Sequence, residues 1–251
     1  METEEKQLQE QQARAVAVEI TSIIREMLPQ LRAELSPESL PRLLAAGALA
    51  RQLCLLEGMI AICDAGQARI AGLIMRAQWE TQLVGLYCML ANKEAAKALV
   101  ADRAYWAKGI ERTWNLEGSW HDKTERMAKW YGEVQPKRLN FTDLAGEIER
   151  LLKDKGYPAD ITTAHQRLYK GESTFTSHPG FEALIRNLKT DGTEWMPDVS
   201  FEPIPSHAAY LCNCAWSAAG LAELLLEALG LSPDRLNAAM AKVSALGDPQ
   251  R

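Results

Sequence analysis

The stretch QARIAGLIMRAQWETQLVGLYCMLA (Gln67–Ala91) decides the fold, because it is nearly all apolar and yet carries Arg69, Arg76 and Glu80. Arg76 and Glu80 are four residues apart, so on a helix they lie one turn apart on the same face, where their side chains can meet. Apolar neighbours on both sides indicate that the pair is partly buried. Burying an ion pair is costly, so the pair is either a structural link or part of a functional site.

Apolar residues recur at three- and four-residue steps along most of the chain, which predicts amphipathic helices. The first helix is expected over residues 7–35, with a kink or an early end at Pro29. The second is expected to begin at Ser36 or one turn later at Pro41 and to end before Gly66. Further helices are expected at residues 93–115, 119–132, 142–155, 160–178, 181–189, 205–230 and after Ser232.

No strand-like alternation longer than a few residues occurs, and no repeat of fixed period is present. The sequence therefore predicts an all-α fold: one domain over residues 1–251, built as a bundle of about 8–9 helices with long antiparallel core helices. Its parts are the N-terminal helix (7–35), a core (40–230), and a C-terminal helix with its tail (232–251).

The chain has 251 residues, of which 47% are hydrophobic and 24% charged, and this composition excludes wholesale disorder. Its formal net charge of -5 argues against coating nucleic acid by bulk electrostatics, while a local basic groove stays open. The polar N-terminus lacks a basic segment followed by an apolar one, so we expect a cytoplasmic protein. Charges such as Arg51 and Glu223 interrupt the most apolar runs, which we interpret as buried core helices and not membrane spans.

The cysteines give no metal or disulfide pattern. All five (Cys54, Cys63, Cys88, Cys212 and Cys214) fall inside apolar helical segments, and we expect reduced core residues. Cys212 and Cys214 are two residues apart, so they point to different helix faces. A glycine-rich phosphate loop and an HExxH motif are also absent, and the sequence predicts no metal and no cofactor.

The segment ITTAHQRLYKGESTFTSHPG (161–180) is the second informative stretch. Arg167, Tyr169, Ser173 and His178 bring donors and acceptors close together, and Pro179 stops the helix directly after the histidine. Histidine transfers protons near neutral pH, and a tyrosine or serine can position a hydroxyl group. The alternative is structural, with His178 satisfying a turn and Tyr169 and Ser173 linking helices.

Together with the central helix, this segment supplies a set of groups that suits RNA cleavage without metal. His178 would move the proton, Arg76 or Arg167 would stabilise a developing negative charge, and the RNA 2′-hydroxyl would be the nucleophile. Glu80 would complete the set if the two segments meet in space.

The stretch Ala68–Leu90, the later YKGESTFTSHP (169–179) and a Leu-rich final helix resemble a widespread bacterial domain family of unknown function. Members of that family show an Arg, a Glu four residues on, and a late Tyr-x-x-x-Ser followed by a His. The resemblance covers roughly residues 40–230 and assigns those positions to Arg76, Glu80, Tyr169, Ser173 and His178.

A more distant similarity is to the HEPN superfamily, all-helical bundles of which many are metal-independent ribonucleases in toxin and phage-defence systems. It implies a homodimer with His178 and an arginine at its centre. The chain departs from the superfamily's catalytic signature, in which four to six residues separate an Arg from the His. Here the nearest upstream arginine of His178 is Arg167, with ten residues between them.

Two functions therefore remain open: a HEPN-like ribonuclease or defence effector acting on RNA, and a non-catalytic helical module that binds a partner protein or a small ligand. The acidic net charge and the missing signature favour the module. The set of polar residues favours a site of some kind. A basic cleft around Arg76 and Arg167 would indicate the nuclease, and an exposed apolar helix face would indicate a protein partner.

Overall fold

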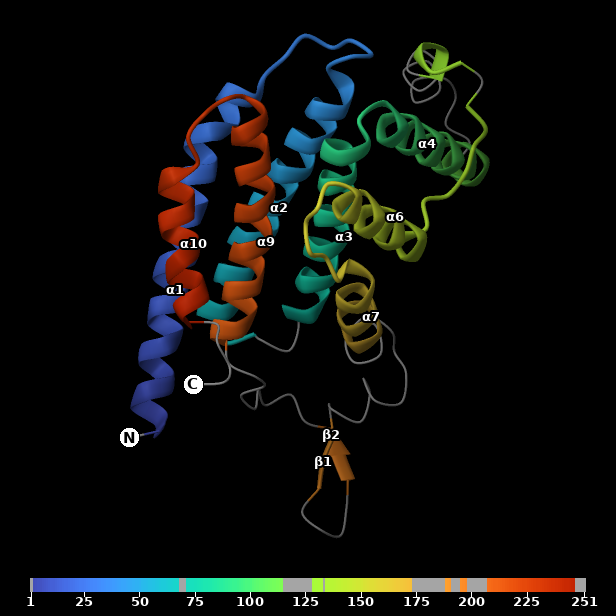
Figure 1. Cartoon of the computed structure of the whole chain (residues 1–251). Coiled ribbons are helices and arrows are strands. Elements are labelled where there is room, and N and C mark those ends of the chain that lie inside the picture. Colours follow the sequence, from blue (N-terminus) through green and yellow to red (C-terminus); the bar gives the residue numbers. More distant parts are fainter. Residues whose placement is uncertain are drawn as a thin grey trace.

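The computed structural model describes residues 2–67, 71–114, 128–132, 134–172, 188–190, 195–197 and 207–246. Its long helices lie side by side as α1 (Glu2–Met27), α2 (Leu40–Asp64), α3 (Ala71–Ala91) and α9 (His207–Ala228), and α10 (Asp234–Leu246) covers α1 and α9 (Figure 1). On the other side of α3 lie α6 (Phe141–Asp154) and α7 (Ile161–Glu172), and α4 (Lys93–Trp114) leaves its upper end. The predicted all-α fold is confirmed.

Helix ends follow the proline signals. The first helix stops at Met27 and continues only as a 3-10 turn, η1 (Leu28–Leu31), so the expected limit at residue 35 is wrong and the early end at Pro29 is confirmed. Proline lacks an N–H and its ring clashes with the carbonyl four residues earlier, which explains the break. The second helix takes the later of its two expected starts, with Pro41 in its first turn.

Gly66 reverses the chain between α2 and α3. Its φ of 69° lies in the left-handed region that glycine adopts without strain. The Gln67 N–H donates to the Ile62 carbonyl at 2.9 Å and the Gly66 N–H donates to the Cys63 carbonyl at 3.0 Å. These two bonds form a Schellman motif, which satisfies carbonyls at the helix end. As a result α3 runs antiparallel to α2, as the sequence predicts.

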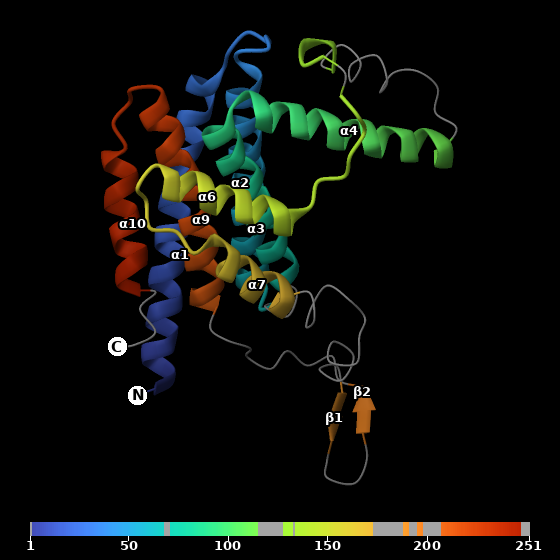
Figure 2. The same ribbon diagram turned by 45° about the vertical axis from the view of Figure 1, so that its right-hand side comes forward.

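Asn92 separates α3 from α4 and gives α4 its direction. Its φ of 47° is the positive value that asparagine tolerates better than most residues, and its carbonyl accepts a hydrogen bond from the Ala96 N–H at 3.1 Å. After this residue α4 runs crosswise to α3 and extends away from the other long helices, and it does not turn back along α3 (Figure 2). The segment that precedes α6 crosses α4 on its way down to α6, and pockets lie between these elements (Figure 2).

The core sits where α1, α2, α3, α9 and α10 meet. Side chains with no measurable exposure come from all these helices and include Ile20, Ile24, Leu49, Leu56, Ala71, Leu221, Leu225 and Leu236. Four of the five cysteines are buried, but Cys54 is exposed, so its expected place in the core is wrong. All five cysteines are free thiols, as the sequence predicts.

Among the described residues, two helices, α2 and α9, are long and apolar enough to cross a membrane by length and composition alone. In the fold both pack against α1 and α3, and the larger share of α9 is buried.

A two-stranded hairpin stands apart from the helices. Strand β1 (Leu188–Thr190) pairs antiparallel with β2 (Trp195–Pro197), with Lys189 opposite Met196. The helix expected at residues 181–189 is therefore wrong at its C-terminal end, and residues 181–187 lie outside the described chain. In the hairpin the backbone N–H and C=O groups of each strand bond to the other strand, and the local sequence pattern that predicted a helix does not identify this partner strand.

Candidate functional site

Arg76 and Glu80 meet on the surface of α3, as their spacing predicts. Arg76 Nε donates to Glu80 Oε1 at 3.1 Å, and the two side chains are 23% and 26% exposed. The pair is thus partly buried, which confirms the interpretation from its apolar neighbours. The carboxylate of Glu80 also lines a pocket between α2, α3 and α4.

The histidine that the structure brings to this part of α3 is His165 of α7. Its Nδ1 accepts a hydrogen bond from Trp79 Nε1 at 3.0 Å, and its Nε2 lies 3.4 Å from Thr142 Oγ1. Because the indole N–H is always a donor, the ring proton sits on Nε2 in the neutral form. The residue is only 2% exposed. His165 thereby links α3, α6 and α7.

Burial lowers the pKa of His165 below its ordinary value, and the nearby Glu80 carboxylate opposes this shift in part. The interior disfavours the charged imidazolium because it is desolvated there, while a neighbouring negative charge favours it. The balance leaves His165 neutral near physiological pH. In this state it serves as an acceptor for Trp79 and a donor toward Thr142.

The other predicted site residues are placed only in part. Arg167 is exposed on α7, and the backbone of Tyr169 belongs to the same helix, while the Tyr169 side chain lies outside what the structure describes. Ser173 and His178 also lie outside the described residues. A common site for Arg76, Glu80 and His178 therefore stays a prediction.

The position of His165 in the sequence indicates a buried side chain, although the residue type alone does not. The histidine lies four residues after Ile161 and three before Leu168, on the apolar stripe of α7. A histidine in such a stripe is expected to face the packed side of its helix and to need polar partners there. Its partners come from α3 and α6, which no local pattern identifies.

A pocket of about 470 Å³ lies between α2, α3, α4 and the start of α6. Apolar side chains, including Leu44, Val84, Leu99 and Phe141, form much of its wall. Arg51 of α2, Arg103 of α4, and Glu80 and Thr81 of α3 are its polar lining residues. Arg51 Nε donates to Thr81 Oγ1 at 3.2 Å, and the Thr81 hydroxyl donates to the Ala77 carbonyl at 2.6 Å. The Arg51 side chain is thus held at the pocket wall.

Within the described ranges, no group of three or more His, Cys, Asp or Glu side chains could hold a metal ion. Two features of the structure are candidate functional sites. One is the Arg76–Glu80 pair beside His165, and the other is the mostly apolar pocket with two arginines. The chain matches no family model, no curated protein and no solved structure.

Proposed function

We propose that the protein is a non-catalytic helical module that binds a small organic anion with an apolar body in the pocket between α2, α3 and α4. The observation that carries this proposal is that Arg51 and Arg103, from two different helices, line one mostly apolar pocket of about 470 Å³. Pockets of roughly 300–1,000 Å³ with apolar walls and a few polar groups are typical of small-molecule sites.

The charges at the pocket favour an anion. Both arginines are positively charged at any physiological pH, because the guanidinium group does not lose its proton in proteins. Among the lining residues that the structure describes, the one carboxylate belongs to Glu80, and Arg76 already pairs with it. The Nε–H of Arg51 already donates to Thr81, but the guanidinium group has further N–H donors on its two terminal nitrogens.

Calorimetric titration with octanoate and with octyl phosphate tests this proposal, with octanol as the uncharged match. We expect the anions to bind and octanol to bind at least about tenfold more weakly, a difference of about 1.4 kcal/mol. Arg51→Ala and Arg103→Ala should each weaken anion binding by about tenfold. Gly47→Leu should block it, because Gly47 lines the pocket and a Cβ there meets no atom within 4 Å.

Arg32→Ala is the matched control, since Arg32 is exposed and is not among the residues that line this pocket. It should bind octanoate as the wild type does. Equal binding of octanol and octanoate, or unchanged binding by both pocket arginine variants, would reject the anion site.

The second candidate function is metal-independent RNA cleavage. It is supported by the position of the Arg76–Glu80 pair, whose carboxylate is close enough to offset part of the lowering of the His165 pKa that burial causes. An arginine, a carboxylate and a histidine are the groups that such cleavage needs. The full engagement of the His165 ring by Trp79 and Thr142 favours the binding module instead.

Incubation of RNA with the purified protein in EDTA tests the ribonuclease. If it is correct, Arg76→Ala and either His165→Gln or His178→Ala should slow cleavage by about 100-fold or more while circular dichroism shows an unchanged helical fold. Arg235→Ala, which removes an exposed ion-pair arginine of α10, is the control. Intact RNA after incubation with the wild type would exclude this function.

A further inference from the structure

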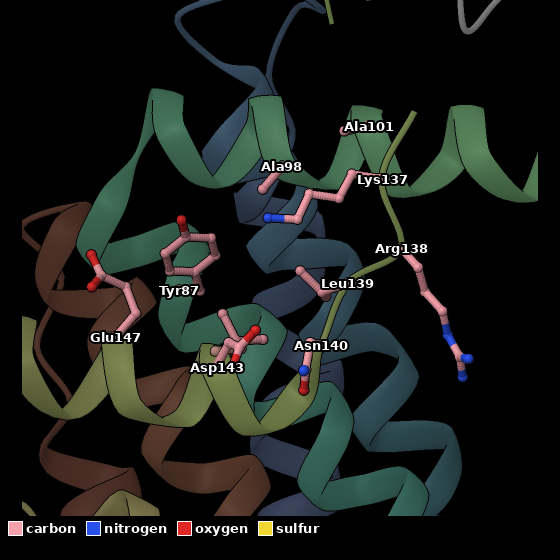
Figure 3. Close-up of a pocket in the computed structure, with 10 residues that line it drawn as sticks. Tyr87, Ala98, Ala101, Lys137, Arg138, Leu139, Asn140, Asp143 and Glu147 are labelled. Atoms are coloured by element: carbon pink, nitrogen blue, oxygen red, sulfur yellow. The ribbon is translucent and has the colours of Figure 1, made fainter. Parts of the chain in front are cut away.

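A second, smaller pocket lies beneath α4 on its α6 side and has a volume of about 210 Å³. Tyr87 of α3, Lys137 and Asn140 of the segment before α6, and Asp143 and Glu147 of α6 supply its polar lining. In Figure 3 the Lys137 side chain extends toward Tyr87, and Asp143 and Glu147 rise from α6 below them. Arg138 points away from this group. Groups of both charges thus surround one small space.

Lys137 and Asp143 have no ion pair and no side-chain hydrogen bond with any residue that the structure describes, and Arg138, which also lines the pocket, lies over the Trp106 ring instead. Glu147, by contrast, accepts two hydrogen bonds from Arg150, at 2.6 and 2.9 Å. The backbone N–H of Lys137 donates to the Ala101 carbonyl at 3.2 Å and thereby fixes the start of its side chain beside α4. The two unpaired charges are therefore presented to the pocket from different elements.

Tyr87 adds a hydroxyl group to the Lys137 side of the pocket. Burial raises the pKa of this phenol, and the Glu147 and Glu94 carboxylates raise it further, so the hydroxyl keeps its proton. A protonated phenol donates a hydrogen bond, and carboxylates are its strongest common acceptors. The Lys137 side therefore suits a carboxylate, and the Asp143 side suits an ammonium group.

We propose that this pocket binds a small zwitterion, a free amino acid or a close relative with one carboxylate and one ammonium group. Lys137 and Tyr87 would bind the carboxylate, and Asp143 would bind the ammonium, with Glu147 adding negative potential. At about 30 Å³ for each water-sized group, the pocket holds roughly seven such groups, the scale of a free amino acid. Molecules with only one of the two charges leave either Lys137 or Asp143 without a partner.

Calorimetry on the full chain tests this site with glycine, alanine, serine and leucine as probes. Two analogues of leucine serve as single-charge probes: isoamylamine, which lacks the carboxylate, and 4-methylpentanoate, which lacks the ammonium group. We expect at least one amino acid to bind and the single-charge analogues to bind at least tenfold more weakly. Lys137→Gln and Asp143→Asn should each weaken amino-acid binding tenfold or more, and Tyr87→Phe should weaken it less.

Two controls separate this site from effects on the fold and from the larger pocket. Asp234→Asn removes the first-turn carboxylate of α10, as Asp143→Asn does in α6, and should leave binding unchanged. Arg51→Ala tests the pocket between α2, α3 and α4 and should also leave amino-acid binding unchanged. The zwitterion site is overturned if none of the four amino acids binds, if the analogues bind equally well, or if both Lys137→Gln and Asp143→Asn retain wild-type affinity.

Discussion

Replacing Gly85 with leucine is expected to lower the free energy of unfolding by about 3 kcal/mol, at the upper end of the usual cost of overpacking a core. Gly85 lies where α3 approaches α9 and α2. A Cβ atom at this position would lie 2.4 Å from Leu221 Cδ2 and 3.3 Å from Ala48 Cβ. Leu221 is fully buried, so it has little room to move away. Urea unfolding followed by far-ultraviolet circular dichroism measures the loss.

Gly146→Leu is the matched control, because Gly146 is an exposed helical glycine of α6 whose added Cβ would meet no atom within 4 Å. It should raise the free energy of unfolding by roughly 0.5–1 kcal/mol, the gain in helix propensity on losing a glycine. Adding Leu221→Ala to Gly85→Leu should recover part of the lost stability, since it vacates the space that the new side chain needs. Equal effects at Gly85 and Gly146 would show that α3 and α9 are not in close contact there.

Local signals in the sequence predict the helices and most of their ends. Pro29 and Gly66 act through their own backbone restrictions, so their effects hold regardless of the surrounding fold. The direction of α4 was not predictable in this way, because it depends on the positive φ of Asn92 and on the contacts that α4 makes afterwards. The exposure of Cys54 is similar: an apolar helical segment predicts burial on average but does not identify the residues that face water.

The candidate site, too, has one part that the local sequence predicts and another part that depends on contacts between distant segments. The Arg76–Glu80 contact follows from helix geometry, because residues four apart share one face. The role of His165 depends on Trp79 and Thr142, which lie 86 and 23 residues away in the chain. Lys137 and Asp143 can be recognised as candidate binding residues only because the fold places both of them around one pocket. Contacts between distant segments therefore account for what sequence analysis missed.

Replacing His165 with alanine is expected to cost about 2–4 kcal/mol of unfolding free energy at pH 7.5. The change leaves the Trp79 N–H without its acceptor and opens a cavity between α3, α6 and α7, and each effect alone costs on the order of 1–3 kcal/mol. His165→Gln should cost less, because an amide can both accept from Trp79 and donate toward Thr142. Chemical unfolding of the three proteins in urea measures these differences.

The same proteins test the charge state of His165. Because burial lowers its pKa in the folded state, His165 contributes stability that is fully present above its unfolded pKa of about 6.5 and is lost as the pH falls below that value. The stability advantage of the wild type over His165→Gln should therefore shrink between pH 7.5 and pH 5. The remaining histidines are common to both proteins, so their contributions cancel in this difference. An advantage that stays constant would mean that His165 takes up its proton equally well in the folded state. The imidazole would then be free to exchange protons beside Arg76 and Glu80, which is the property that RNA cleavage requires and the binding module does not.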